Sequence, residues 1–391
     1  MRVQTKQINY LLLIPFAGFI MIGVAGSLMG IAWPSVRGSF GLSLSALGSL
    51  LLASTIGFLL VSISMGRLVA KIGIGWFLFS GFLLSGIGYL GYAITPSWWI
   101  LVFCGLVTGW GVGSIDAGLN YYAAENHSVR TMNWLHASFG VGAAFGPILM
   151  TAIFQAGLSW RFGFAINSVL NFLMCLALGL TMGQWRQVHT AAQQKGQSQA
   201  SISATLKRVI VWLSILIFFV LTGLEGSTAQ WTYTFFTEGR SVNLAMAGLW
   251  VSFFWSGMTV GRIVLGAVVE RVGSKRLLRL CLVGTILATV GIMAQSDTLN
   301  ALSMAFLGFC IGPTFPTLMS GTPNRVGVGY VGHTVGFQMA ATSIGFSMLP
   351  ALLGVLAEDL GLEVVGVFLV VTAVITLLLH EIIQFWLYRT A

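Results

Sequence analysis

WWILVFCGLVTGWGVGSIDAGLNYY, residues 98–122, is long and apolar enough to cross a lipid bilayer, and Asp116 is its only charged residue. A helix of about 20 apolar residues spans the hydrocarbon core of a membrane. A carboxylate at such depth costs about 3 kcal/mol even on lenient insertion scales, so it usually faces a protein-lined or water-filled interior and has a function there. Glu225 is likewise the only charge between Val209 and Phe236.

The composition places the whole chain in a membrane. Of its 391 residues, 57% are hydrophobic and 7% are charged, whereas about 25% of the residues in a soluble domain are charged. The four cysteines lie in apolar runs without the spacing of a disulfide framework or a metal site. We therefore expect an integral membrane protein without disulfides or bound metal.

Apolar windows predict an all-α protein with twelve membrane-spanning helices. A transmembrane barrel would instead show short segments of alternating polarity, which the sequence lacks. The predicted spans are residues 10–33, 45–66, 73–95, 98–122, 132–156, 161–183, 209–236, 243–268, 276–296, 298–320, 333–357 and 363–386.

Loop charges predict the orientation. With the N-terminus in the cytoplasm, the outer loops hold only Arg37, Arg161 and Arg240, and the other 16 of the 19 basic residues lie inside. An excess of Lys and Arg marks cytoplasmic loops. We expect a multi-pass protein of the cell inner (plasma) membrane with both termini in the cytoplasm, and a monomer.

The spans divide into two similar halves. A polar, basic segment, residues 184–208, separates residues 1–183 from residues 209–391 and reads as a cytoplasmic linker. The segment GRLVAKIG at residues 66–73 is similar to GAVVERVG at residues 266–273. The fifth and eleventh spans each contain a proline near their end, Pro147 and Pro350. Two parallel six-helix repeats are typical of transporters that bind their solute between the halves.

These inner loops resemble the G-x-L-x-D-R-x-G-R-K/R motif of the major facilitator superfamily. The resemblance implies that Arg67, Lys71, Glu270 and Arg271 control a cytoplasmic gate. The second loop keeps an acid as Glu270, whereas Ala70 replaces the acid in the first.

Three segments are similar to the fucose–proton symporter branch and its glucose-type carriers. They are IDAGLN at residues 115–120, NWLHASFG at residues 133–140, and GLEGS at residues 223–227 followed by Gln230 and Trp231. Fucose symporters have an essential Asp in the first helix, but residues 10–33 contain no acid. The likeness implies a proton-coupled sugar carrier that relies on other carboxylates.

The fourth and fifth spans form a hairpin in which four polar residues lie at matching depths. Asp116 and Asn120 share one helix face, as do Asn133 and His136. We predict that Asp116 accepts the coupling proton with His136 beside it, and that Asn120 and Asn133 contact the solute. The alternative is a permanent Asp–His pair that serves packing alone.

Glu225 is the second predicted proton-coupling residue. Gly223 and Gly226 flank it, as in the unwound helices of transporters, and Gln230 and Trp231 follow one turn later. An amide bonds sugar hydroxyls and an indole stacks on the apolar face of a pyranose, so we predict that both contact the solute. The alternative is a helix packed by glycines with one polar residue bonding a neighbour.

Further polar and aromatic residues inside spans are weaker candidates. We include Gln338 and Trp255 in the predicted solute site, whereas Asn167 and Asn171 are expected to bond between helices. Arg262 lies under two turns from the inner end of its span, so its side chain is expected to reach the cytoplasmic surface.

Motifs for other classes are missing from the sequence. It has no GxxxxGK[ST] loop, HExxH, CxxC or GxSxG, and its basic residues form no continuous stripe for nucleic acid. We therefore expect a protein that is not an enzyme and needs no cofactor.

The expected function is symport of a hexose or related sugar with protons, by alternating access between the two halves. Three alternatives remain: a proton-driven exporter of drugs or metabolites, sodium-coupled sugar symport, and a transporter-like sensor that carries nothing. Sodium is an alternative because Asp, Asn and Ser oxygens can ligate a hard cation. A pore channel would need a ring of like charges, which the sequence lacks.

Overall fold

The computed structural model describes residues 12–126, 129–185 and 201–390, and these are almost entirely helical. The first half holds six long helices: α1 (Leu13–Phe40), α2 (Leu47–Ile72), α3 (Ile74–Ile94), α4 (Trp98–Asn126), α5 (Val129–Gln155) and α6 (Arg161–Trp185). The second half holds α7 (Ile202–Leu206), α8 (Val209–Thr234), α9 (Leu244–Val272), α10 (Ser274–Ile292), α11 (Asp297–Ile311), α12 (Thr314–Ser320), α13 (Thr322–Val326), α14 (Val331–Leu360) and α15 (Val364–Thr390).

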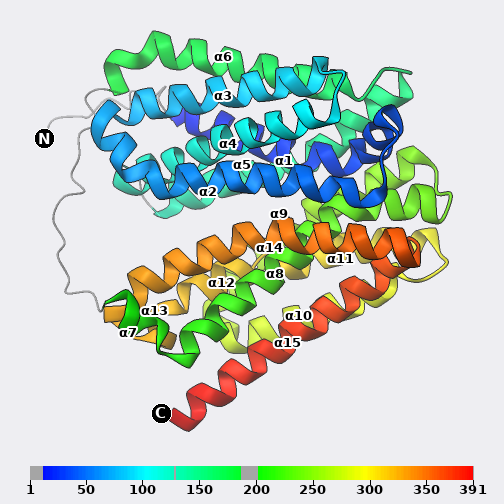
Figure 1. Cartoon of the computed structure of the whole chain (residues 1–391). Coiled ribbons are helices and arrows are strands. Elements are labelled where there is room, and N and C mark those ends of the chain that lie inside the picture. The colour runs from blue at the N-terminus through cyan, green and yellow to red at the C-terminus, as the bar shows by residue number, and fades with distance from the viewer. Residues whose placement is uncertain (1–11, 127–128, 186–200, 391) are drawn as a thin grey trace, which may run out of the picture.

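These helices form the predicted all-α membrane fold with two six-helix repeats. Within the described residues, eleven helices are long and apolar enough to cross a membrane. One further long helix, α10, completes the twelve predicted spans and packs beside α11 and α15. It is less apolar than the other eleven, because Lys275, Arg276 and Arg279 lie in its first two turns. Figure 1 shows α1–α6 as one lobe and α8–α15 as the other.

Glycines set the same close helix contacts in both lobes. A Cβ atom on Gly109 of α4 would collide with the carbonyl oxygen of Ser54 in α2. About 200 residues later, a Cβ on Gly308 of α11 would collide with the carbonyl oxygen of Phe254 in α9. Small residues allow such close approach of membrane helices. The repeat seen in the loop motifs therefore extends to helix packing.

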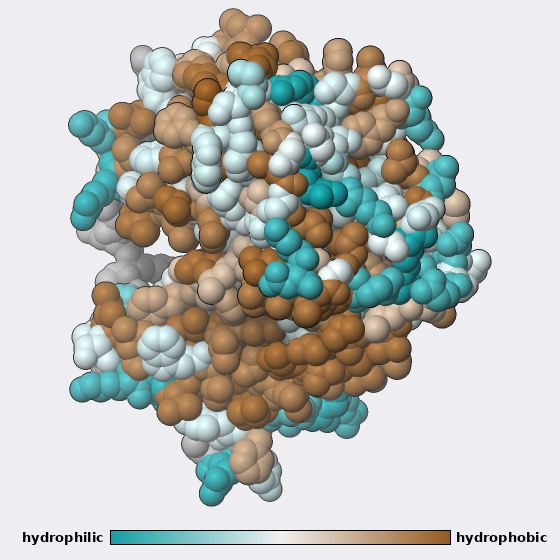
Figure 2. Space-filling model, turned by 45° about the vertical axis from the view of Figure 1, so that its right-hand side comes forward, coloured by the Kyte–Doolittle hydropathy of each residue, from teal (hydrophilic) through white to brown (hydrophobic). Residues whose placement is uncertain are grey.

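The flank of the molecule suits a lipid environment. Apolar residues cover much of the side of the molecule in Figure 2, whereas hydrophilic residues gather toward the ends. Exposed large hydrophobic side chains lie along most of the long helices, including Phe103, Leu180 and Leu280. These side chains meet lipid rather than water in a multi-pass membrane protein.

We call the end of the bundle with Ile72 and Val272 the inner end, after the predicted orientation, and the opposite end the outer end. The halves meet at the outer end. Arg37 of α1 forms an ion pair of 2.7 Å with Glu238, which lies in the π-helical turn η3 (Phe235–Gly239) after α8. The backbone N–H of Ser45 donates to Glu358 of α14 at 3.1 Å. Deeper in, the backbones of Gly30 in α1 and Ala229 in α8 are in close contact.

At the inner end the two lobes are apart. Arg67, Lys71 and Arg271 are all exposed, and Figure 2 shows a notch between the lobes on its left side. Both hydrogen bonds that the described residues form between the halves lie at the outer end. The structure is therefore closed outside and open inside. The side chain of Glu270 lies outside the described part, so the predicted gate residues remain a proposal.

Two predicted spans have different shapes in the structure. The first continues through Pro34 to Phe40, because the preceding turns are already packed in the core and a proline removes only one helical hydrogen bond. The tenth is interrupted between Ile311 and Thr314, at Gly312-Pro313. Further along, Pro316 has no N–H to offer the carbonyl oxygen of Gly312, four residues earlier, and this oxygen becomes available to another helix.

The predicted linker is described only from Ser201 onward, where it includes the short helix α7. The Ser201 side chain caps α7 by accepting from the N–H of Ala204. Residues 186–200 lie outside the described part, so the division into residues 1–183, 184–208 and 209–391 remains a proposal.

Neutralising Arg37 is expected to open the outer end more often. Arg37→Gln removes an ion pair whose side chains are 29% and 30% exposed. Partly exposed pairs contribute about 0.2–1 kcal/mol, so the equilibrium should shift up to about fivefold. The readout is the labelling rate of an Ala351→Cys variant by a membrane-impermeant maleimide, since Ala351 packs against Gly48 across the halves.

The charge exchange Arg37→Glu with Glu238→Arg should return the labelling rate to that of the parent. Equal labelling of all these variants would show that the ion pair does not hold the outer end closed.

Candidate functional site

Asp116 lies on the face of α4 between its contacts with α1 and α2. Gly111 and Gly118 pack against α3 on the opposite face, and Leu119 packs against Gly18 of α1. Asp116 is half-buried, and Asn120 donates to its Oδ1 at 3.1 Å and to its backbone oxygen at 2.9 Å. The predicted pair of Asp116 and Asn120 is therefore present. Among the described residues, no hydrogen bond to the second carboxylate oxygen of Asp116 is present.

His136 is placed differently from the prediction. Its ring makes an edge-on contact with Phe19 of α1, with centroids 5.3 Å apart, and its charged form would interact with Arg262 of α9. Among the described residues the hydrogen-bond partner of Asp116 is Asn120, not His136. The reason is that α1 packs between α4 and α5, so matching depth in the hairpin does not bring the two side chains together. The side chain of Asn133 lies outside the described part.

Glu225 lies on the face of α8 that is turned toward the first half. It lies one turn further in than Ala229, which contacts Gly30 of α1, and on nearly the same side of α8. The predicted neighbours Gly223 and Gly226 instead receive Leu349 and Phe346 of α14, so they serve close packing here. The α-helix is continuous through all of these positions. Glu225 is half-buried, and the described residues form no hydrogen bond with its carboxylate.

Arg262 is the residue that the sequence interpretation missed. Its Nε donates to the carbonyl oxygen of Gly312 at 3.1 Å, the oxygen left free by Pro316. Its charge interacts with that of Glu225. The prediction that Arg262 reaches the cytoplasmic surface is wrong, because this hydrogen bond holds it against α11 inside the bundle. The sequence shows Pro316, but only the fold shows which donor meets the freed oxygen.

The predicted solute residues further out are buried in this closed arrangement. Trp255 of α9 packs edge-on against Phe139 of α5 across the halves, with centroids 6.1 Å apart. The described residues offer no hydrogen-bond partner to its Nε1 or to Oε1 of Gln230, although both atoms are buried. An unpaired buried polar atom costs about 1–3 kcal/mol, so these two atoms are suited to bind water or a solute.

Trp231 and Gln338 hold the second half together instead. Nε1 of Trp231 donates to the backbone oxygen of Pro350 at 2.8 Å, and the indole is fully buried against α14. Oε1 of Gln338 accepts from Thr322 of α13 at 3.2 Å. Trp231 is therefore removed from the solute site. Nε2 of Gln338 is buried without a partner among the described residues, so Gln338 stays a predicted solute contact.

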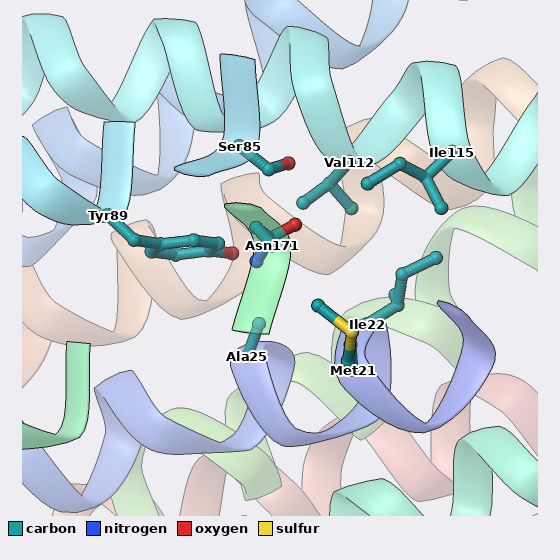
Figure 3. Close-up of a pocket in the computed structure, with 8 residues that line it drawn as sticks. All are labelled: Met21, Ile22, Ala25, Ser85, Tyr89, Val112, Ile115 and Asn171. Carbon is teal, nitrogen blue, oxygen red and sulfur yellow. The ribbon is translucent and has the colours of Figure 1, made fainter. Parts of the chain in front are cut away.

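A small pocket lies inside the first half, between α1, α3, α4 and α6 (Figure 3). It has space for water-sized molecules, and the Tyr89 hydroxyl points toward Asn171 in it. Both amide atoms of the nearby Asn167 and the hydroxyl of Ser85 are buried without a partner among the described residues. Nδ2 of Asn171 donates to the backbone oxygen of Asn167 within α6 at 2.8 Å, so the described residues show no hydrogen bond from either asparagine side chain to another helix.

Two helices from each half thus carry titratable groups inside the bundle. The first half supplies Asp116 and His136, and the second supplies Glu225 and Arg262. Arg262 and His136 lie one turn inside the contact of Gly140 of α5 with Thr259 of α9. Glu225 lies one turn inside the contact of Gly30 with Ala229, and Asp116 lies deeper, near the level of Gly18 on α1. Such a site can exchange protons and bind a polar solute from the open inner end. Among the described residues no group of three or more potential metal ligands is present.

Sequence comparison gives the family and several relatives. The family model described as Major Facilitator Superfamily matches residues 15–349. Bypass of stop codon protein 6 of Saccharomyces cerevisiae is 25% identical over 68% of this chain, and the match spans only 60% of that protein. The glucose/mannose transporter GlcP of Bacillus subtilis is 22% identical over 71% of each chain. Multidrug resistance protein 2 of Bacillus subtilis is 24% identical over 88% of this chain and 86% of its own length.

Solved structures share the fold. A crystal structure of a bacterial homolog of the human lysosomal transporter Spinster, in an inward-facing and occupied conformation, has a TM-score of 0.79 at 13% identity and covers 97% of both chains. A mutant of the nucleoside transporter NupG has a TM-score of 0.80 at 14% identity, over 96% of this chain and all of that one. At these identities the likeness concerns the fold alone.

Proposed function

This chain belongs to the Major Facilitator Superfamily, and from that membership we propose that it is a proton-coupled symporter of a hexose or related sugar. That it is a transporter of small solutes rather than an enzyme follows from the family itself. The finer assignment rests on one observation: each half has a half-buried carboxylate within a membrane-spanning helix, Asp116 in α4 and Glu225 in α8, and Glu225 lies on the face of α8 toward the first half.

The two carboxylates explain how protons and solute are coupled. A charged carboxylate opposes closure of the halves around it, because closure would remove it from water. Protonation of Asp116 and Glu225 from the outer side removes that cost, and the halves then rock around the bound solute to expose it inside. Release of the protons at the inner end resets the cycle. Arg67, Lys71, Glu270 and Arg271 would then close the inner end in the outward-open state.

The solute class rests on neutral hydrogen-bonding groups near the carboxylates. Asn120, Gln230 and Trp255 supply amides and an indole N–H, which suit hydroxyl groups. The resemblance of residues 115–120 and 223–227 to sugar symporters supports this choice, as does the similarity to the glucose/mannose transporter of Bacillus subtilis. We also propose that the protein lies in the plasma membrane, as a monomer, with both termini in the cytoplasm.

Uptake by right-side-out membrane vesicles tests this function. Vesicles with the protein should accumulate labelled glucose, mannose or fucose, and addition of the sugar should make a weakly buffered outer medium more alkaline. The alkaline shift should vanish with a proton ionophore and should not need sodium. Uptake that requires sodium and leaves the pH unchanged would overturn proton coupling.

An exporter of drugs or metabolites is the second candidate. The similarity to multidrug resistance protein 2 favours it, since that match covers 88% of this chain. Proton-driven extrusion of a fluorescent cationic dye from energised cells, with no counterflow of any hexose, would support the exporter and contradict the symporter.

A further inference from the structure

We propose that Arg262 binds the solute directly, and that the solute is a neutral polyol whose neighbouring hydroxyls bridge Arg262 and Glu225. This inference rests on the proposed sugar transport and assigns its contact points. It gives a role to the one intramembrane arginine of the site.

The hydrogen bonds of Arg262 leave its terminal groups free. Its Nε is held by the Gly312 carbonyl oxygen, which fixes the plane of the guanidinium. Among the described residues this is its only hydrogen bond, and its two terminal NH₂ groups are not among the fully buried atoms. A guanidinium presents its donors in a rigid fork that suits two adjacent oxygen atoms. Arg262 is therefore oriented for a ligand by a protein contact that the ligand does not disturb.

The position of Arg262 puts these donors in the solute space. Thr259, one turn further out on α9, meets Gly140 of α5, and Trp255 another turn out meets Phe139. Arg262 thus occupies the first turn of α9 inside the closed contact, on the side that faces α5. His136 lies in the corresponding turn of α5, one turn further in than Gly140.

The charges favour a neutral solute with adjacent hydroxyls. Glu225 lies one turn inside Ala229 on α8, and Arg262 lies one turn inside Thr259 on the neighbouring helix α9. The two form no ion pair within 4.0 Å in the described residues. A hydroxyl group donates to a carboxylate and accepts from a guanidinium, so a diol can bond both at once. An anionic solute would meet the repulsion of Glu225. In the inward-open state, after the proton has left Glu225, the carboxylate and the guanidinium carry opposite charges, and this pair leaves no net charge for the solute to match.

Binding of deoxy sugars to Arg262 variants tests this contact. Purified wild-type protein is titrated with glucose, mannose and fucose and with their single-deoxy analogues. For Arg262→Gln the affinity for the bound sugar should fall about 10–100-fold, as for loss of a charge-assisted hydrogen bond. Arg262→Lys keeps the charge without the fork and should lose about 10-fold. Arg279→Gln removes an exposed arginine paired with Glu381 elsewhere in the second half and should bind as the wild type does.

The deoxy analogues separate contact from structure. One of them should bind the wild type at least about 10-fold more weakly than the parent sugar, and this difference should shrink to within about twofold in Arg262→Gln. If Arg262 had a merely structural role, Arg262→Gln would weaken the binding of all sugars equally and would keep the affinity difference between parent and deoxy sugar. That result would overturn the proposal. The titration of the wild type with deoxy sugars tests the contact even if Arg262→Gln misfolds. If every deoxy analogue binds the wild type as tightly as its parent sugar does, the contact is also overturned.

The same titrations separate this inference from the proposed function. If the wild type neither binds nor exchanges any hexose, the proposed function and the Arg262 contact both fail. If it exchanges hexoses and Arg262→Gln binds them unchanged, only the contact fails. Tighter binding of glucuronate than of glucose would show that Arg262 selects an anion, and would overturn the neutral polyol.

Discussion

Neutralising both Asp116 and Glu225 is expected to abolish uphill accumulation of sugar while leaving exchange intact. Asp116→Asn keeps an oxygen that can accept from Asn120, so the local hydrogen bond of 3.1 Å survives. Glu225→Gln breaks no hydrogen bond with the described residues. Both replacements preserve shape, and what they remove is the ability to bind and release a proton.

The magnitude follows from the driving force. One proton moving down 100 mV supplies about 2.3 kcal/mol, enough for roughly 50-fold accumulation. The double variant should reach an accumulation ratio of about one, with sugar counterflow within about threefold of the wild type. Asp297→Asn neutralises an exposed acid at the outer end and should leave accumulation unchanged. Proton-driven accumulation by the double variant would remove both acids from the coupling mechanism.

Replacing Gly30 by leucine is expected to trap the transporter open at its outer end. A Cβ atom on Gly30 would collide with the backbone oxygen of Ala229 where α1 meets α8 across the halves. A backbone atom cannot move aside as a flexible side chain can, so the halves have to separate at this level. Transport should fall below about a tenth of the wild-type rate, because every cycle needs this contact to close.

Gly38 provides the matched control for this prediction. It lies two turns later on α1, at the outer end, and a Cβ atom there would meet nothing within 4 Å. Gly38→Leu should therefore keep transport, whereas Gly30→Leu should raise the labelling rate of Ala351→Cys by an impermeant maleimide at least about tenfold. Slow labelling in Gly30→Leu, with normal amounts of protein in the membrane, would mean that the outer end closes without this contact.

Much of the fold was predictable from the sequence, because hydropathy is a local property. The run at residues 98–122 has to cross the bilayer wherever its neighbours lie, since no other environment suits so many apolar side chains. The interruption at Gly312 was not predicted, although Pro316 is visible in the sequence. A proline in a span can be accommodated, and its effect depends on which donor reaches the freed oxygen.

The candidate site was predictable in part. Asp116 and Glu225 were found because an isolated carboxylate in an apolar run has few structural explanations. His136 was placed at a suitable depth but beside the wrong partner, and Trp231 was assigned to the solute although it bonds Pro350. Depth along a helix follows from counting residues. The direction of a side chain depends on how neighbouring helices are rotated and packed.

The sequence by itself thus determined a membrane protein of two repeated six-helix halves with two acids inside it. The tertiary structure decided which groups those acids meet. It packed α1 between α4 and α5, which separates Asp116 from His136, and it brought Arg262 to Gly312 and toward Glu225. The physical reason is that helix rotation is set by close glycine contacts between segments far apart in the chain, which no local pattern encodes.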